Sequence, residues 1–193
     1  MRAMLCSHNA HKVQELQQLL PELDLRPLPA NEDLPPEIGA TFLDNARIKA
    51  EAGAALHPGR WVIADDSGLQ VDALDGEPGV HSARFAGVGA SDAENNALLL
   101  ERMAGVADSF RTARFVCVLV ALAPDGRELV AEGTVEGRIA HTPTGRNGFG
   151  YDPLFIPDGE HRSFGELPGG HKQQISHRAH AARALAAQLQ ALE

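Results

Sequence analysis

The amino-acid sequence predicts a single mixed α/β domain covering residues 1–193. The length fits the roughly 100 to 200 residues that one domain usually takes. Hydrophobic residues make up 44% of the chain and charged residues 22%, which is typical of a folded protein with a sizeable core. Strand-like apolar runs alternate with apolar residues at helical spacing, without an internal repeat or a low-complexity linker.

The first third of the chain predicts a strand and two helices. Residues 3–6 form a short apolar run, and residues 13–20 then place apolar side chains at helical spacing. After a proline-rich loop, Thr41 and Asp44 resemble a capping box, so a second helix is expected to start there and to stop at residues 57–59.

The middle of the chain predicts a buried strand, a long loop and a third helix. Residues 61–64 are apolar at consecutive positions, as in a strand covered on both faces, and the strand is expected to end there. Residues 75–90 are rich in glycine and predict a long loop that serves as a flap or an interface segment. Ser91 and Glu94 form a second capping box and start a helix.

The last third predicts a β-ribbon and a final helix. Residues 112–123, 128–132 and 134–139 favour strands, and Pro124-Asp125-Gly126 predicts a turn between the first two, so an antiparallel ribbon is expected. After a glycine-rich stretch, one helix presents an apolar face from Ile175 to Leu189.

Composition excludes several function classes. Lys plus Arg number 17 and Asp plus Glu 26, and the net charge of −9 argues against a protein that grips nucleic-acid backbones. Cys6 and Cys117 lie in apolar runs and predict buried thiols in a reducing cytoplasm. No apolar run approaches the roughly 18 residues of a membrane span, and the polar residues from Ser7 onward argue against a signal peptide, so export is not expected.

Two segments of the first half are candidates for phosphate binding. The loop Ser7-His8-Asn9-Ala10-His11-Lys12 combines helix N-terminal N–H groups with a hydroxyl, an amide and a lysine, although an Asn9 helix cap beside a solvated Lys12 is the simpler interpretation. Asn45 and Lys49 share one helix face and could reach a triphosphate. The alternative is an exposed helix lysine, with Glu37 upstream as the added support for a site.

The segment Asp65-Asp66-Ser67-Gly68 is the most suggestive. Successive strand residues point to opposite faces, so the two carboxylates are expected to have different roles. A carboxylate at a strand end is well placed for Mg²⁺, which prefers carboxylate oxygens together with substrate phosphates. The alternative is a turn whose Asp and Gly serve backbone geometry.

Two further segments suggest recognition of a base or of an anionic group. Phe149 and Tyr151 lie in the glycine loop Gly148–Pro153, where a ring can stack on a base or anchor the core. Lys172, Ser176, His177 and Arg178 crowd the start of the last helix, and cations there oppose the helix dipole. A ligand with an anionic or carbonyl group explains them better than a structural purpose.

Two other enzyme classes are poorly supported. Cys6, His8 and His11 have the donor types of a zinc site, but no second cluster completes four ligands. A serine hydrolase is not indicated either, because Gly-x-Ser-x-Gly does not occur.

Taken in order, these segments resemble the inosine/xanthosine triphosphate pyrophosphatase family over nearly the whole chain. Six spaced motifs make this resemblance specific, and one departure is His8, where many relatives have a small residue. The motifs are Ser7-x-Asn9-x-x-Lys12, Glu37-x-Gly39-x-Thr41-Phe42-x-x-Asn45-Ala46-x-x-Lys49-Ala50, Ala64-Asp65-Asp66-Ser67-Gly68-Leu69, Pro78-Gly79-x-x-Ser82-Ala83-Arg84, Gly148-Phe149-Gly150-Tyr151-Asp152-Pro153 and Ser176-His177-Arg178.

The resemblance implies a two-lobed α/β fold around a long mixed sheet, an active-site cleft between the lobes, a homodimer and dependence on Mg²⁺. The implied reaction converts a nucleoside triphosphate and water into a monophosphate and pyrophosphate. By position, Asp66 is similar to the general base and a metal ligand, Glu37 to a second metal ligand, and Ser67 to a substrate contact. The phosphate set comprises Ser7 to Lys12, Lys49 and Lys172, with Asn45 also at the substrate, and the base set comprises Phe149, Gly150, Tyr151, Asp152, His177 and Arg178.

Hypoxanthine and xanthine carry a 6-keto oxygen where adenine has an amino group, so donors from His177, Arg178 or the loop N–H groups would favour ITP, dITP and XTP. A pyrophosphatase of similar fold with another base preference, such as the Maf-like enzymes acting on dTTP, UTP or modified nucleotides, is the nearest rival. A nucleotide-binding regulator without turnover is the alternative from a different class.

Overall fold

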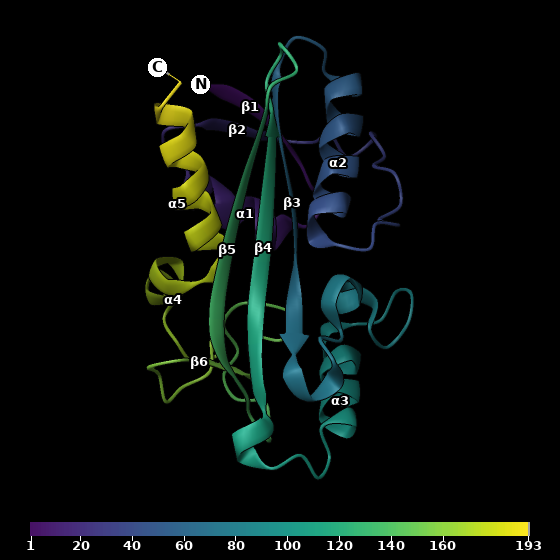
Figure 1. Ribbon diagram of the computed structural model, residues 1–193, viewed down its shortest axis with the longest axis vertical. Coiled ribbons are helices and arrows are strands. Elements are labelled where there is room, and N and C mark those ends of the chain that lie inside the picture. The colour runs from purple at the N-terminus through teal and green to yellow at the C-terminus, as the bar shows by residue number, and fades with distance from the viewer. Residues whose placement is uncertain (193) are drawn as a thin grey trace. The chain divides into compact units, whose positions relative to one another are not determined.

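The computed structural model describes residues 1–192. Within these residues the chain forms an open six-stranded mixed sheet in the order β2-β1-β3-β4-β5-β6, flanked by helices (Figure 1), which confirms the predicted fold class. The elements, in chain order, are β1 (Arg2–Cys6), α1 (Ala10–Leu19), β2 (Asp24–Pro27), α2 (Phe42–Leu56), β3 (Trp61–Val71), the 3-10 helices η1 (Asp72–Leu74) and η2 (Gly79–Arg84), α3 (Asp92–Arg102), η3 (Asp108–Phe110), β4 (Thr112–Leu122), β5 (Glu128–Ile139), β6 (Phe155–Pro157), α4 (Gly169–Ile175) and α5 (His177–Gln190).

The chain divides into two compact units. Unit 1 comprises Met1–Asp66, Cys117–Gly133 and the segment from His177, and unit 2 comprises Ser67–Val116 and Thr134–Ser176. Strands β3, β4 and β5 each have one part in either unit. The predicted site residues are therefore divided between the units, and each unit is described by itself.

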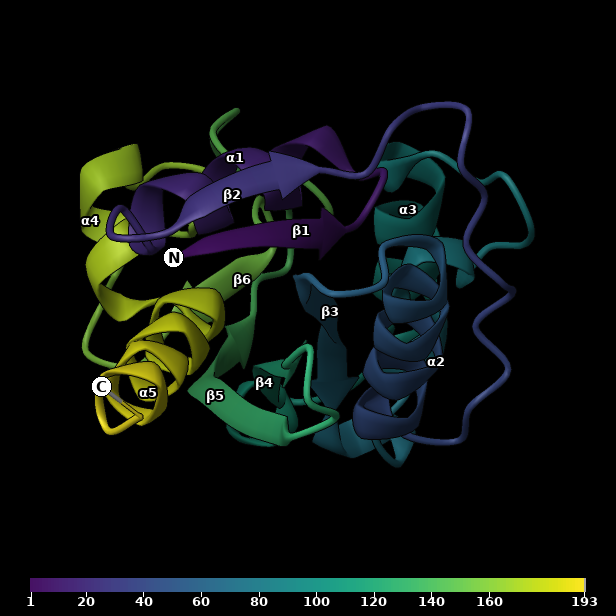
Figure 2. The ribbon, with the colours of Figure 1, turned by 90° about the horizontal axis from the view of Figure 1, so that it is seen from above.

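In unit 1, β1 pairs in parallel with β2 and with β3 (Figure 2). Helix α1 contacts β2 and α5, and α2 contacts β1. Fully buried side chains such as Leu5, Leu16 and Ile63 form the core of this unit. Cys6 and Cys117 are buried free thiols, as predicted. The helix starts are also confirmed, because Asn9 caps α1 and the Thr41–Asp44 capping box starts α2.

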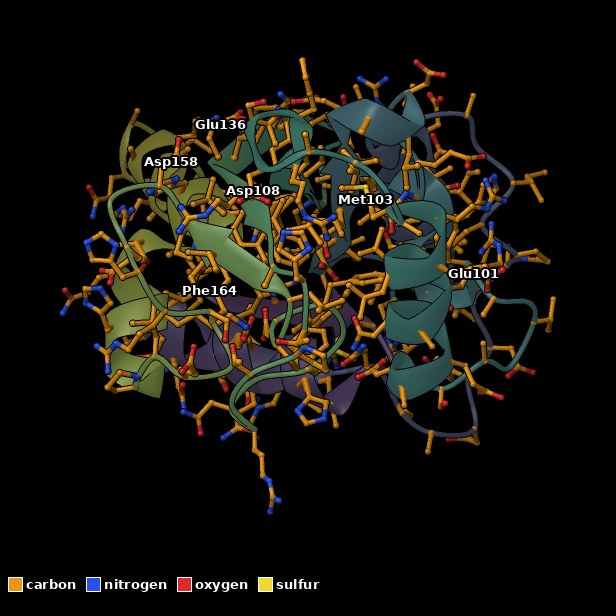
Figure 3. The ribbon with its side chains drawn as sticks, turned by 90° about the horizontal axis from the view of Figure 1, so that it is seen from below. Glu101, Met103, Asp108, Glu136, Asp158 and Phe164 are labelled. Carbon is orange, nitrogen blue, oxygen red and sulfur yellow. The ribbon has the colours of Figure 1, made fainter. Side chains whose placement is uncertain are left out.

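In unit 2, the Ser91–Glu94 capping box starts α3 as predicted. Met103 closes the buried stripe of this helix, whereas Glu101 lies exposed on its outer face (Figure 3). Phe164 is fully buried and stacks on Phe155 with a centroid distance of 5.4 Å. Met103, Phe155 and Phe164 belong to a second apolar core.

The strand β3 differs from its prediction. It does not end before Asp65 but runs on to Val71, so Asp65 and Asp66 lie inside a strand. The neighbouring strand β1 ends at Cys6, which is paired with Ala64. The polar residues therefore begin where the partner strand ends, and the local apolar pattern alone could not distinguish that from the end of β3 itself.

Three other predictions need correction. Residues 75–90 are not a continuous loop, because η2 forms there. The two strands expected around Gly133 are one strand, β5, in which a Cβ at Gly133 would overlap the backbone of α5. The single last helix is two helices, because the extended backbone of Ser176 ends α4 before α5 begins.

No helix that residues 1–192 form is long and apolar enough to cross a membrane.

Candidate active site

The loop between β1 and α1 is organised by Asn9. Its Oδ1 accepts hydrogen bonds from the N–H groups of His11 at 3.0 Å and Lys12 at 3.2 Å, which caps the helix. The Asn9 N–H in turn donates to the hydroxyl of the largely buried Ser7. The capping role is confirmed, and phosphate binding by this loop stays a prediction. The loop residues on its outer side, His8, Ala10 and His11, are exposed.

Lys49 joins two of the predicted acids. Its Nζ lies 2.6 Å from an oxygen of Glu37 and 3.3 Å from Oδ1 of Asp66. Only 7% of the Lys49 side chain is exposed, so it is not the solvated helix lysine that was the alternative. We call these three residues the acid–lysine cluster.

Asn45, one helical turn before Lys49 on α2, hydrogen-bonds to this cluster. It is completely buried, and its Nδ2 donates to Oδ2 of Asp66 at 3.1 Å. Its Oδ1 accepts the N–H of Gly39 at 2.7 Å, two residues after Glu37. A Cβ on Gly39 would lie 2.8 Å from that Oδ1, so the close approach requires glycine. Asn45 thus ties the loop of Glu37 to the carboxylate of Asp66.

Asp65 faces a different set of residues from Asp66, as strand alternation predicts. One of its oxygens lies 3.1 Å from Nζ of Lys12 and 3.5 Å from a guanidinium nitrogen of Arg178. Arg178 also pairs with Glu15 of α1 and is 1% exposed. These carboxylates supply a structural reason for a cation in the first turn of α5, which the sequence did not indicate.

The pKa values of the two neighbouring carboxyl groups are shifted in opposite directions. Burial raises the pKa of Asp65, but the charges of Lys12, Arg178 and Lys49 outweigh it and hold the pKa well below its usual value. Burial also raises the pKa of Asp66, and there the nearby lysines offset it only in part. Burial lowers the pKa of Lys49, but the surrounding carboxylates raise it above its usual value overall. Asp66 is therefore the better proton acceptor of the pair.

Unit 2 holds the glycine loop. The N–H of Phe149 donates to Asp152 at 2.9 Å, and the buried Asp152 also accepts from Nζ of Lys172 at 2.6 Å. That ammonium lies 5.1 Å from the centre of the Phe149 ring, within the range of a cation–π contact. The phenol of Tyr151 donates to the carbonyl of Ser82 at 2.8 Å, and burial raises its pKa.

The structure thus assembles the predicted residues in two groups. Unit 1 brings together Glu37, Asn45, Lys49 and Asp66, with Lys12, Asp65 and Arg178 beside them, and it also holds the buried His177. Unit 2 brings together Phe149, Gly150, Tyr151, Asp152 and Lys172, and it holds the half-buried Ser67.

Sequence reasoning missed three polar residues that hold these groups in place. Glu15 pairs with Arg178 from a distant part of the chain, and no local pattern could reveal this. On α3, Asp92 and Asn96 hydrogen-bond Gly150. Their i, i+4 spacing was readable, but their partner was not.

Glu37 and Asp66 offer a donor set that fits Mg²⁺. Among residues 1–192 no group of three or more His, Cys, Asp or Glu side chains is arranged to hold a metal. Mg²⁺ usually needs only one or two carboxylates, because water and substrate phosphates complete its shell. The oxygens of Glu37 and Asp66 already lie within 3.3 Å of one cationic nitrogen.

Residues 3–188 match the Ham1 family. A protein of an Exiguobacterium species named dITP/XTP pyrophosphatase is 49% identical over 98% of this chain and 97% of its own length. A Corynebacterium glutamicum protein of the same name is 48% identical over 96% and 95%. The predicted resemblance is thereby confirmed.

Solved structures agree with these relatives. The Staphylococcus aureus Ham1 protein superposes with a TM-score of 0.89 at 39% identity and covers 100% of both chains. The nucleoside-triphosphatase, or dITP/XTP pyrophosphatase, of Mycobacterium abscessus gives a TM-score of 0.77 at 44% identity over 98% of this chain and 99% of its own. On its motifs, its fold and its full-length relatives, this chain belongs to the Ham1 family.

Proposed function

We propose that this protein hydrolyses non-standard purine nucleoside triphosphates, namely ITP, dITP and XTP, to the monophosphate and pyrophosphate. The names of its full-length relatives support this substrate class. The observation that carries the proposal is the acid–lysine cluster, in which a buried carboxylate with a raised pKa lies against a lysine that also pairs with a second acid. Such a reaction removes deaminated nucleotides from the pool before they enter DNA or RNA.

Asp66 is the proposed general base. It takes a proton from water, whose oxygen forms a bond to the α-phosphorus while the bond from that phosphorus to the bridging oxygen breaks. Pyrophosphate leaves with the bonding electron pair. A base with a raised pKa accepts this proton better than one with a depressed pKa, which favours Asp66 over Asp65.

Charge on the phosphates would be balanced by cationic side chains and by Mg²⁺. Lys49 and Lys12 supply positive charge in unit 1, and we propose Glu37 and Asp66 as the residues that hold the metal. When bound, Mg²⁺ neutralises phosphate charge and polarises the phosphoryl oxygens. The carboxylates now paired with Lys49 would then exchange an ammonium for a divalent cation, which leaves the lysine available for a phosphate.

Phe149 of unit 2 is the residue that we propose to offer a ring face to the base. Two expected donors for a 6-keto oxygen are already engaged, because the N–H of Phe149 donates to Asp152 and that of Gly150 donates to Asp92. His177 and Arg178 stay as the proposed keto-recognising donors, although the guanidinium of Arg178 is already paired with Glu15 and Asp65. Adenine would leave such a buried donor unpaired, at a cost of about 1 to 3 kcal/mol.

We also propose that the protein acts as a cytoplasmic homodimer on small nucleotides, without a membrane or nucleic-acid partner. The net charge of −9 and the two free thiols support this setting. Light scattering of the purified protein tests the dimer, for which twice the 20.6 kDa chain mass is expected.

A substrate panel tests the function. Pyrophosphate release is measured from ITP, dITP, XTP, GTP, ATP, dTTP and UTP with and without Mg²⁺. We expect the first three to be hydrolysed best and only with the metal. Preference for dTTP or UTP would favour the Maf-like alternative, and binding of ITP without turnover would favour a regulator.

The variant Asp66→Asn tests the base. Loss of a general base commonly costs about 100- to 10,000-fold in rate, so turnover should fall in that range while ITP binding stays measurable by calorimetry. Asp65→Asn is the matched comparison, because it changes the neighbouring carboxylate on the opposite face. An Asp66→Asn enzyme within a few fold of the parent would refute the assignment.

A further inference from the structure

Helix α3 contributes two side chains that hold the backbone of the glycine loop. Oδ2 of Asp92 accepts the N–H of Gly150 at 2.6 Å, and Nδ2 of Asn96 donates to the carbonyl of Gly150 at 3.0 Å. The two residues are one helical turn apart and share one face. Both hydrogen-bonding groups of a single loop residue are therefore fixed by one helix, and we call this pair the α3 clamp.

Asn96 occupies a position where an apolar residue would be expected. It is 9% exposed and lies on the buried stripe that Leu99 and Met103 continue. Its Oδ1 is buried and finds no hydrogen-bond partner among residues 1–192. A buried unpaired acceptor does not stabilise the fold. The favourable polar interaction of the Asn96 side chain is therefore the hydrogen bond from its Nδ2 to Gly150.

The clamp acts at a point where the loop conformation is demanding. Gly148 and Gly150 have left-handed φ values of 72° and 60°, and a Cβ on Gly148 would overlap the Asp152 carboxylate. Phe149 lies between these two glycines. With Asp152 holding the Phe149 N–H and the clamp holding Gly150, the peptide on either side of the Phe149 ring has a fixed orientation.

We propose that Asp92 and Asn96 are positioning residues that set the orientation of Phe149 and thereby the recognition of the purine base. The inference rests on the proposed function, in which Phe149 contacts the base. Asp92 and Asn96 are not among the residues proposed to bind phosphate or metal. Its loss should weaken nucleotide binding through the base and leave the chemistry at the α-phosphorus unchanged.

The test compares Asn96→Leu with Asn95→Leu. Asn95 is the matched control, since it is 3% exposed on the same helix but bonds Ala83 and Ala86 rather than Gly150. Asn96→Leu removes an unpaired buried oxygen but also the donor to the half-buried Gly150 carbonyl, so its Tm should stay close to the parent value while KM for ITP rises about 3- to 10-fold at constant kcat. Asn95→Leu should lower Tm and leave KM for ITP unchanged.

A substrate without a base separates the two proposals. Ribose 5-triphosphate reports only the phosphate side, so Asn96→Leu should leave its kcat/KM within about 2-fold of the parent. Asp92→Ala, at an exposed position, should show the same pattern, and Asp92→Asn should restore part of the ITP affinity because it keeps an acceptor.

Three results would overturn the inference: an unchanged KM for ITP in both Asn96→Leu and Asp92→Ala, an equal loss on ribose 5-triphosphate, or a lower kcat at unchanged KM. Failure of the proposed function appears separately, as a parent enzyme that does not prefer ITP and XTP in the substrate panel.

Discussion

Asn45→Asp probes the acid–lysine cluster with almost no change in shape. Asp keeps an acceptor for the Gly39 N–H but replaces the Nδ2 that donates to Asp66 at 3.1 Å by a carboxylate oxygen. Two like charges at this distance repel by about 5 kcal/mol at an effective dielectric of about 20. Protonating one of them at pH 7 instead costs about 4 kcal/mol, at 1.36 kcal/mol per unit above an ordinary Asp pKa.

The smaller of these two figures sets the expected loss, about 4 kcal/mol in the free energy of unfolding. For a chain of this size it corresponds to a fall in Tm of about 8 to 16 °C. Activity should fall at least about 100-fold, because Asp66 loses its donor and shares its proton with a second acid. Thermal unfolding followed by circular dichroism and pyrophosphate release from ITP give the two quantities.

Asn95→Asp is the control, because it also puts an acid at a buried asparagine but faces the Ala83 and Ala86 backbone groups. It should lower Tm and leave the turnover number close to that of the parent. If Asn45→Asp keeps both Tm and kcat at pH 7, then the amide of Asn45 does not hold the carboxylate of Asp66.

Three further predictions follow from the same contacts. Lys49→Gln leaves Glu37 and Asp66 facing each other without an ammonium, so Mg²⁺ should raise its Tm more than that of the parent, and an equal increase would contradict the metal assignment. The depressed pKa of Asp65 contributes stability above the ordinary Asp pKa near 3.9 that is lost as pH falls below it, so the deficit of Asp65→Asn in urea unfolding should be largest at neutral pH and should shrink toward pH 3.5. Burial raises the pKa of Cys6 and of Cys117 to about 12, so Ellman's reagent at pH 8 should titrate both thiols only after unfolding, and fast reaction of the native protein would show that one is accessible.

Local sequence signals predicted the elements well where the cause of the structure is itself local. Both capping boxes, Thr41 with Asp44 and Ser91 with Glu94, lie where they were expected, because a capping bond spans only three residues. The predicted element boundaries that depend on residues far away in the sequence were wrong. The end of β3 was misplaced because β1, not β3, stops beside Ala64, and the break at Ser176 was missed because the apolar spacing continues across it.

The candidate site shows the same limit. The motifs supplied the residue types of the acid–lysine cluster, but they did not show that Asn45 is fully buried with its amide directed at Asp66 and Gly39. Lys172 was assigned to the same helix start as His177 and Arg178, whereas its ammonium pairs with Asp152 in unit 2. A local sequence pattern identifies a cationic residue, but it does not show which carboxylate pairs with it in the folded chain.

The Asp65-Asp66 pair shows what is gained once partners are known. Alternation along a strand predicted two faces, and therefore two roles, but gave no reason to prefer either carboxylate as a base. On one face Asp65 meets Lys12 and Arg178, and those charges keep it ionised. On the other face Asp66 meets Lys49 and the neutral amide of Asn45, and burial is offset only in part. A carboxylate that takes up and releases a proton is better placed on the second face, so the proposed division of roles rests on the neighbours of the two acids and not on their order in the sequence.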